Sequence, residues 1–397
     1  MGSRELALFG GDKTARDPFP PWPQFSEKTF TEVLEPLRSG RVGYWSGDRG
    51  RELETRWARW TGAPWAVCCA SGTAALHVSL LALGIGAGDE VIVPAYTFAS
   101  TALAVVHAGA QPVFCDSMED GTIDPRAVEE LLTPRTKAVI AVHLYGVVCA
   151  MDRVLEAAGR RGLPVVEDCA QCAGGEWKGK KAGTLGNAGC FSFSQGKHVS
   201  TGGEGGMIVC GDEGFARACR SFCDYGRQLD DDSGSAGAGA AHVRAGFNYR
   251  MTEIQAVIGL CELERLDTWN LPRRRGYAKI YDHAFSQQYG VRSVPPSSTD
   301  RWNAYWKYPL QLDLAKLTCG AEEFSRALAA EGIPECSLSS PLGYTEPALS
   351  RWAKGRCETA EALRSRTVLL GLSPSWEKSH VETCVAAVKK VLHAYRR

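Results

Sequence analysis

Residues 65–116 read WAVCCASGTAALHVSLLALGIGAGDEVIVPAYTFASTALAVVHAGAQPVFCD, and this stretch decides the fold class. Short apolar runs, at 65–70 and 90–95, alternate with longer segments of helical pattern, and the alternation continues as far as residue 170. Near-continuous apolar strands separated by helices are typical of a mostly parallel sheet that helices cover on both faces. Ligands in such sheets bind beyond the carboxyl ends of the strands, so we expect functional residues where the strands end.

The chain has 397 residues and a mass of 42.9 kDa, which is long for one hydrophobic core and favours two domains. Pro272 interrupts a long helical pattern at 248–285, and we expect a break or kink there. We therefore predict an N-terminal arm and a large domain over 1–266, and a smaller C-terminal α+β domain over 267–397.

The composition is that of an ordinary soluble globular protein, with 44% hydrophobic and 23% charged residues. Lys plus Arg and Asp plus Glu both number 45, so the net charge is zero and gives no electrostatic signature of nucleic-acid or membrane binding. No apolar run approaches the ~20 residues that cross a bilayer. Because the N-terminus also lacks a secretory signal pattern, we expect a cytoplasmic protein.

The 15 cysteines lie largely in apolar contexts, and we expect them to be small buried hydrophobic residues. A disulfide scaffold is not expected in a reducing compartment. Cys169 and Cys172 form a Cys-x-x-Cys pair, but no second pair follows at zinc spacing, so the sequence predicts no metal site.

Four segments carry candidate chemistry, and the first two could hold an anion and a planar ring. Ser71, Gly72 and Thr73 stand between a strand and a helix, where the N–H groups of a helix N-terminus bind phosphate. Taken alone, these residues are equally an ordinary N-cap. Phe98, in the loop after the next strand, could stack on a ring or belong to the core.

The other two segments bear a carboxylate and an amine. Asp168 ends an apolar strand, and because a buried unpaired carboxylate is costly, it needs a helix N-terminus or a cationic ligand atom as its partner. Lys197 lies between Ser192 and the glycine-rich run 201–206, and a lysine in a partly desolvated pocket forms Schiff bases readily. Together the four segments describe a site for pyridoxal phosphate (PLP), which needs a phosphate cup, a ring stacker, a carboxylate for its pyridinium and a Schiff-base lysine.

The chain resembles the DegT-type sugar aminotransferases, which are fold-type I PLP enzymes of the aspartate aminotransferase superfamily. The resemblance extends from about Phe19 to Val391 and rests on SGTAALHVSLLALGIGAGDEVIVPAYTF (71–98), VHLYG (142–146), VVEDCAQCAGGEWKGKKAGTLGNAGCFSFSQGKHVSTGGEGGMI (165–208) and GFNYRMTEIQAVIGL (246–260). It implies a large domain with a mostly parallel seven-stranded sheet between helices, and a smaller C-terminal α+β domain. Within the family, the sequence is similar in style to L-glutamine:scyllo-inosose aminotransferases and 3-amino-5-hydroxybenzoate synthases.

The resemblance also implies a role for each matching residue. Lys197 would form the Schiff base with PLP and then move the α-proton, while Asp168 would pair with the pyridine nitrogen. The remaining cofactor contacts would be Gly72, Thr73 and Ser192 at the phosphate, Phe98 on the ring face, Gln171 beside the phenolic oxygen, and Asn248 at the phosphate bound by a neighbouring subunit. The last contact implies a homodimer with shared active sites.

Candidate substrate contacts are Trp45, Tyr96, His143 and Arg250. His143 could instead be a structural histidine, and Arg250 could belong to a structural ion pair. Among the tryptophans that could line an acceptor pocket, we prefer Trp45 to Trp22 and Trp306 because Trp45 lies on a glycine-rich loop.

We expect an aminotransferase that moves an amino group from glutamine or glutamate to a cyclic keto-polyol or ketosugar in aminocyclitol or aminosugar antibiotic biosynthesis. Alternatives are a 3-amino-5-hydroxybenzoate-synthase-like enzyme, a nucleotide-ketosugar aminotransferase and, in a different class, a non-catalytic regulatory or partner subunit with this fold. Relatives that dehydrate sugars carry histidine in place of the lysine, so Lys197 favours transamination. Two departures from the family pattern, Ser71 in place of the common Asn and the small-residue loop Asp230–His242, leave the acceptor open.

Overall fold

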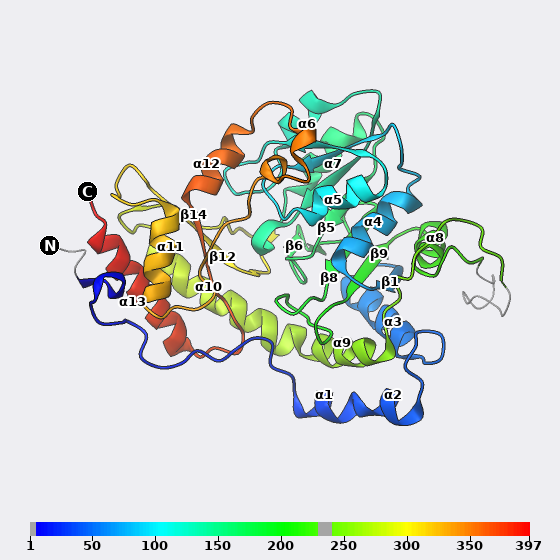
Figure 1. Ribbon diagram of the computed structural model, residues 1–397, viewed down its shortest axis with the longest axis horizontal. Coiled ribbons are helices and arrows are strands. Elements are labelled where there is room, and N and C mark those ends of the chain that lie inside the picture. Colours follow the sequence, from blue (N-terminus) through cyan, green and yellow to red (C-terminus); the bar gives the residue numbers. More distant parts are fainter. Residues whose placement is uncertain (1–4, 229–239) are drawn as a thin grey trace.

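The computed structural model describes residues 5–228 and 240–397. Figure 1 shows a larger body built around one sheet and a smaller body at the other end of the molecule. The helical stretch formed by α9 (Glu253–Arg265) and α10 (Leu271–Phe285) runs from the larger body to the smaller one. The N-terminal segment follows the same edge of the molecule before it reaches α1 (Glu27–Glu32) and α2 (Leu34–Ser39).

The larger body contains a seven-stranded sheet with the order β1-β9-β8-β5-β4-β2-β3. Its strands are β1 (Trp65–Cys69), β2 (Glu90–Pro94), β3 (Gln111–Cys115), β4 (Thr136–Val142), β5 (Val165–Asp168), β8 (Ala188–Ser192) and β9 (Gly206–Cys210). Neighbours from β3 to β8 pair in parallel, whereas β9 pairs antiparallel with both β8 and β1. The predicted mostly parallel sheet is therefore confirmed, and β9 runs against the others.

Helices cover both faces of this sheet because successive side chains of each strand point to opposite sides. In β2, Val91 and Val93 face the layer that contains α4 (Gly72–Ala82), α5 (Ser100–His107) and α8 (Glu213–Cys223), and Ile92 faces the other way. The opposite layer contains α3 (Arg49–Thr61), α6 (Pro125–Leu131), α7 (Met151–Gly159) and α9. Each fully buried Val or Ile stabilises this arrangement by about 1.5–3 kcal/mol.

Near Pro272, where we expected a break or kink, the helix continues, but its α-helical pattern is interrupted by a π-helical turn. A capping box, in which Thr252 and Gln255 exchange hydrogen bonds, starts α9, and α9 ends in a π-helical turn at Leu266–Asn270. α10 follows directly at Leu271 and has Pro272, which lacks an N–H, in its first turn.

The smaller body has a four-stranded antiparallel sheet with the order β10-β12-β14-β13. Its elements are β10 (Val291–Ser293), β12 (Tyr308–Leu312), α11 (Ala321–Ala330), β13 (Ser337–Leu338), α12 (Glu358–Arg366), β14 (Thr367–Leu370) and α13 (Lys378–Ala394). A small sheet of β6 (Glu176–Trp177), β7 (Lys180–Lys181) and β11 (Arg301–Trp302) joins the two bodies, because β11 comes from the C-terminal part of the chain.

The N-terminal segment packs on the C-terminal part of the chain. Leu6 is fully buried in the hydrophobic cluster of the smaller body. The carboxylate of Glu331 accepts hydrogen bonds from the N–H groups of Ala7 and Thr14, both at 2.9 Å, and the ring of Phe19 contacts that of Trp376 at 4.9 Å between centroids. The domain division at 266/267 remains a proposal, and these contacts tie residues 6–19 to the far end of the chain.

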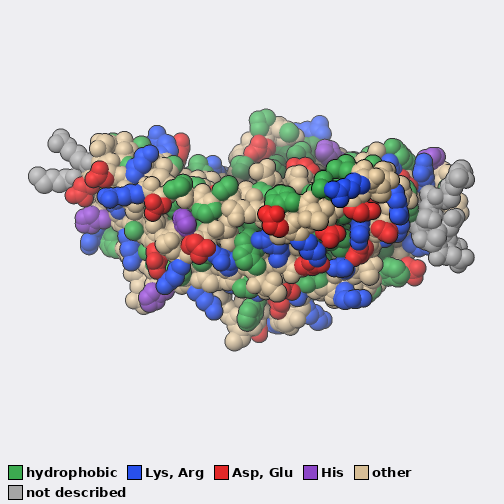
Figure 2. Space-filling view, turned by 90° about the horizontal axis from the view of Figure 1, so that it is seen from below, with side chains coloured by type: hydrophobic (Ala, Val, Ile, Leu, Met, Phe, Trp, Pro, Cys, Tyr) green, Lys and Arg blue, Asp and Glu red, His purple; other side chains and the backbone are tan. Residues whose placement is uncertain are grey.

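The molecular surface carries charges of both signs. Figure 2 shows Lys and Arg interspersed with Asp and Glu over the face drawn, which agrees with a net charge of zero. Of the helices that the structure describes, none combines the length and apolar character required to cross a membrane.

Candidate active site

Lys197 lies in the loop between β8 and β9, in a largely desolvated position. Its N–H donates to the carbonyl of Ser194 at 2.9 Å, and its Nζ lies 4.3 Å from the centre of the Trp306 ring. Burial lowers the pKa of Lys197 to about 8, although the negative charges of Asp168 and Glu204 raise it. An amine with this pKa is substantially unprotonated in mildly alkaline solution, which is the form that attacks a carbonyl.

Asp168 is the last residue of β5, and only 5% of its surface is exposed. The N–H of Ala170 donates to Oδ1 at 3.1 Å, and Thr101 Oγ1 donates to Oδ2 at 2.9 Å. Burial raises the pKa of Asp168, whereas these two hydrogen bonds and the charge of Lys197 lower it. Since a carboxylate has about four acceptor positions, Asp168 can still accept a hydrogen bond from a protonated ring nitrogen.

The predicted phosphate site lies where α4 begins. Ser71 Oγ accepts the N–H of Ala74 at 3.1 Å, which caps the helix. A Cβ atom on Gly72 would lie 2.7 Å from Cβ of Ser192, so the glycine allows the end of β8 to approach the first turn. The structure thus brings Gly72, Thr73 and Ser192 together at the N-terminus of α4, and helix N-termini bind anions.

Phe98 and Gln171 lie after strand ends of the same sheet. Phe98 is 62% exposed although Tyr96 and Thr97 before it are buried, so its ring is available for stacking. Gln171 is buried, and its Oε1 accepts the N–H of Tyr145 at 2.6 Å, in the turn that follows β4.

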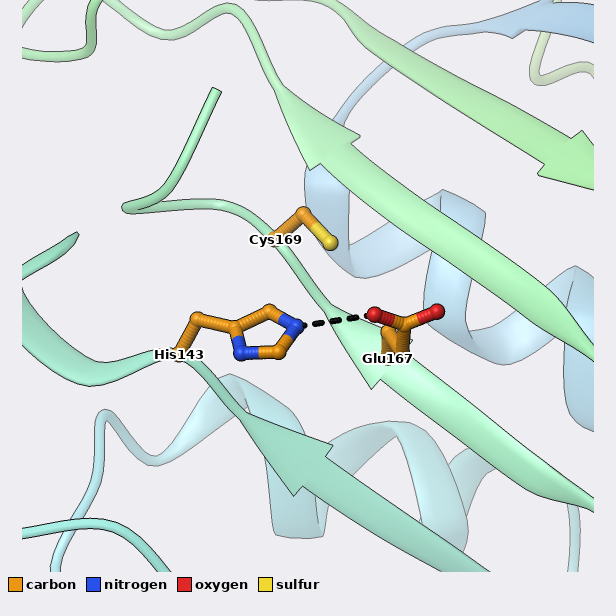
Figure 3. A group of neighbouring side chains, drawn as sticks. All are labelled: His143, Glu167 and Cys169. Atoms are coloured by element: carbon orange, nitrogen blue, oxygen red, sulfur yellow. Dashed lines mark hydrogen bonds and ion pairs between the residues drawn. The ribbon is translucent and has the colours of Figure 1, made fainter. Parts of the chain in front are cut away.

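His143 does not fit the predicted substrate contact. Figure 3 shows His143 beside Glu167 and Cys169. The atoms of these three side chains that could bind a metal lie within 4.8 Å of one another. His143 Nδ1 accepts the N–H of Cys149 at 3.1 Å, so Nε2 carries the proton and donates to Glu167 at 3.0 Å. Because His143 is fully buried with both ring nitrogens engaged, the structural interpretation is the one that the geometry supports.

Tyr96 is only 1% exposed, so direct contact with a substrate is not supported either. Its ring lies 6.1 Å from that of Tyr145 and lines a cleft of about 200 Å³ between the two bodies of the molecule.

Trp45, Asn248 and Arg250 lie together around Asp224, a residue that is 1% exposed at the end of α8. Trp45 Nε1 donates to Asp224 Oδ2 at 3.0 Å, and Arg250 forms an ion pair with Oδ1 of the same carboxylate. Asn248 pairs with Asp224 through a backbone β-bridge and is exposed. Within the described ranges, no hydrogen bond or ring contact joins these three residues to Lys197 of the same subunit.

Trp22 and Trp306, which the sequence analysis ranked below Trp45, contact the loop that carries Lys197. Trp306 Nε1 donates to the carbonyl of Gly196 at 2.6 Å, and Trp22 Nε1 donates to the carbonyl of Lys197 at 3.1 Å. The sequence analysis did not single out Thr101, whose hydroxyl donates a hydrogen bond to Asp168. The aromatic-rich segments around Trp22 and Trp306 were visible in the sequence, but nothing in them indicates which loop they contact.

Residues 23–389 match the DegT/DnrJ/EryC1/StrS aminotransferase family. The chain belongs to this family. It is 34% identical over 354 residues to the UDP-N-acetyl-3-dehydro-alpha-D-glucosamine 3-aminotransferase of Acidithiobacillus ferrooxidans, covering 87% of this chain and 89% of that protein. It is 39% identical over 348 residues to the L-glutamine:2-deoxy-scyllo-inosose aminotransferase of Streptomyces fradiae, covering 85% and 81%.

A putative sugar aminotransferase of Streptococcus pneumoniae, solved in its PLP form, superposes with a TM-score of 0.85 at 26% identity, covering 96% of this chain and 99% of that one. This member of the DegT/DnrJ/EryC1/StrS family is thus a PLP-dependent aminotransferase, as its sequence predicted. The residues present fit the cofactor: an amine whose pKa burial lowers to about 8, a buried carboxylate, an exposed aromatic ring and a helix N-terminus that can bind an anion. Part of the loop Asp230–His242, residues 230–239, lies outside the described residues.

Proposed function

We propose that this aminotransferase moves an amino group from glutamine or glutamate to a ketone of a cyclic polyol or ketosugar in aminocyclitol or aminosugar antibiotic biosynthesis. The observation that carries the reaction type is the pair formed by Lys197, whose pKa burial lowers to about 8, and the buried Asp168. The acceptor is supported by the similarity to the Streptomyces fradiae enzyme.

In this proposal each residue has a chemical task. PLP, when bound, supplies an electron-accepting ring that stabilises the charge left when an α-proton is removed. Lys197 is the amine that would hold the cofactor and, once free, would take up and return the proton of the α-carbon at its Nζ. Asp168 keeps the ring nitrogen protonated, with Thr101 fixing the orientation of the carboxylate. Phe98 confines the ring plane.

We also propose a homodimer with shared active sites. Support comes from Asn248, which is exposed rather than packed in its own subunit. The arm formed by α1 and α2 exposes Phe30 at 54%, Leu34 at 40% and Leu37 at 56%, and a second subunit would shield these side chains from water.

The decisive experiment combines the visible spectrum with an acceptor panel. The purified protein should be yellow, lose that absorbance with glutamine, and show neither property in Lys197→Ala. A panel of free cyclic polyol ketones and nucleotide-linked ketosugars, each supplied with the glutamine-treated protein, should then restore the yellow form only with the free ketones. Restoration only by a nucleotide-linked ketosugar would overturn the acceptor proposal while leaving the aminotransferase intact.

A second outcome concerns the 3-amino-5-hydroxybenzoate-synthase-like alternative. Release of water with aromatisation of the substrate, in the absence of any amino donor, would establish that alternative. A protein that binds PLP but reacts with no amino donor would instead be a non-catalytic subunit.

A further inference from the structure

The turn after β4 holds a strained residue at the edge of the active site. Tyr145 has φ 57° and ψ 10°, in the left-handed region that a non-glycine residue rarely adopts. Such a conformation persists only where surrounding contacts fix it, and it is found most often at functional sites. In this conformation the N–H of Tyr145 points at the side chain of Gln171, 2.6 Å from Oε1.

This hydrogen bond determines which end of the Gln171 amide faces the active site. A backbone N–H can only donate, so the atom that it meets must be the amide oxygen. The amide nitrogen is then directed away from the turn, and no hydrogen bond from this nitrogen is found among residues 5–228 and 240–397. Gln171 therefore offers a donor, rather than an acceptor, to a ligand bound beside it.

The turn is held at its base by His143. Its Nδ1 accepts the N–H of Cys149, which lies just beyond the turn, at 3.1 Å. The same assignment leaves Nε2 as a donor to Glu167 Oε2 at 3.0 Å, as drawn in Figure 3. The ring is thus fixed at both nitrogens, one bond reaching the turn and the other reaching the sheet.

Glu167 is a rigid anchor for that ring. Besides His143, its carboxylate accepts the N–H groups of Gly183 at 2.8 Å, Leu185 at 2.7 Å and Gly186 at 2.6 Å. All four acceptor positions are in use, and the side chain is fully buried. Glu167 and Asp168 are consecutive in β5, so their side chains leave opposite faces of the sheet and the anchor does not contact the cofactor site itself.

We infer that His143 is a positioning residue: through its bonds to Glu167 and to the Cys149 N–H, it fixes the strained turn that orients the Gln171 amide as a donor toward the cofactor ring. The inference rests on the proposed function and on the placement of Gln171 beside the phenolic oxygen of PLP, which the family resemblance implies. It also gives a function to the buried group of His143 and Glu167, which the chemical steps do not use.

Two substitutions separate the two bonds of His143. Asparagine places a polar atom near the position of Nδ1, so His143→Asn keeps an acceptor for Cys149 and loses the donor to Glu167. Glutamine reaches the position of Nε2, so His143→Gln keeps the bond to Glu167 and loses the bond to the turn. The two variants are therefore matched controls for each other.

The first measurement is hydrogen exchange in the cofactor-free full-length protein. In His143→Gln, the amides of Tyr145 and Cys149 should exchange about tenfold faster than in the wild type, while those of the distant strand β14 stay unchanged. In His143→Asn, exchange in the turn should remain close to that of the wild type. Unchanged exchange of both amides in His143→Gln would overturn the inference, whatever the protein catalyses.

The second measurement is the visible circular dichroism of the PLP-loaded protein, which reports how firmly the ring is held. His143→Gln should lower the signal per bound PLP about as much as Gln171→Leu does, and the double variant should show no further loss, because both act at one contact. If the double variant loses as much circular dichroism signal as the two single variants together, His143 does not act through Gln171. Absence of a PLP signal in the wild type itself would contradict the proposed function instead.

Discussion

At the scale of single residues, burial rather than pairing sets the protonation states in the active site. Asp168 and Lys197 are close enough for each to influence the pKa of the other, yet both are displaced toward their neutral forms. Removal from water therefore outweighs their mutual attraction. This balance suits the role that we propose for Lys197, first as a nucleophile and then as a base.

The pH dependence of Lys197 follows from this balance. In the cofactor-free protein, the rate at which an amine-reactive reagent modifies Lys197 should rise through about pH 8, because the unprotonated amine is the reactive form. Asp168→Asn removes the charge that raises the pKa of Lys197, so the midpoint should move to lower pH. Peptide mass spectrometry after timed labelling gives both rates.

Lys178 is the internal control for that experiment. It is exposed, and its hydrogen bond to Asp152 raises its pKa above the ordinary value of 10.5. A labelling profile of Lys197 that coincides with that of Lys178 would contradict the desolvated position.

The sequence was informative about residues whose chemistry is rare at their position. A carboxylate at the end of an apolar strand and a lysine before a glycine-rich run both stand out without any coordinates. Thr101 and Trp306 do not, because a threonine in a helix and a tryptophan in the bend before β12 can be assigned a role only once the groups that they contact are known. The same reason explains His143, whose role depends on Cys149 and Glu167.

At the scale of elements, the start of α4 combines a helix cap with the proposed phosphate site. Gly72→Ala should weaken PLP binding, because the added Cβ would lie 2.7 Å from Cβ of Ser192 and push the end of β8 away from the helix N-terminus. Gly276→Ala, in the middle of α10, is the matched control, because its Cβ would meet nothing within 4 Å.

Titration of each apo variant with PLP, followed by urea unfolding, distinguishes the two glycines. Gly276→Ala should raise the free energy of unfolding by up to about 1 kcal/mol, since alanine is the better helix former, and leave PLP affinity unchanged. Equal PLP affinity in Gly72→Ala and the wild type would show that the close approach of Ser192 is not required.

The arrangement of elements could be predicted only in part. The alternating apolar pattern predicted the strands and helices of the parallel sheet, and Pro272 lies just after the π-helical turn that joins α9 to α10. The direction of β9 could not be predicted, because an apolar run such as Gly206–Cys210 is compatible with a parallel or an antiparallel neighbour. Direction depends on the length and path of the preceding loop.

At the scale of the whole molecule, the proposed dimer predicts that two defective chains can restore one active site. Lys197→Ala lacks the nucleophile, and Asn248→Asp would place a negative charge against the cofactor phosphate of its partner. In the heterodimer, one site combines an intact Lys197 with an intact Asn248. The purified heterodimer, carrying a different affinity tag on each chain, should have about half of the wild-type activity, because a two-fold assembly has two equivalent sites.

Both parent homodimers serve as references and should be nearly inactive. A heterodimer no more active than the mean of its parents would show that each site is built from one chain. Sedimentation of the wild type at the same concentration confirms the assembly state in which the comparison is made.

The contacts of the N-terminal segment also determine the order in which parts of the chain can fold during synthesis. Leu6 is buried against side chains from residues 277–395, and Trp22 reaches the carbonyl of Lys197 only after passing that cluster. Leu6 is synthesised before residues 277–395 and can dock only after those residues have been made, although the sheet between them is already free to form. A chain released before residues 277–395 are made should contain a folded sheet in which Trp22 does not yet contact the Lys197 loop. A bulky domain fused ahead of Leu6 should slow the docking of the N-terminal segment and not the formation of the sheet.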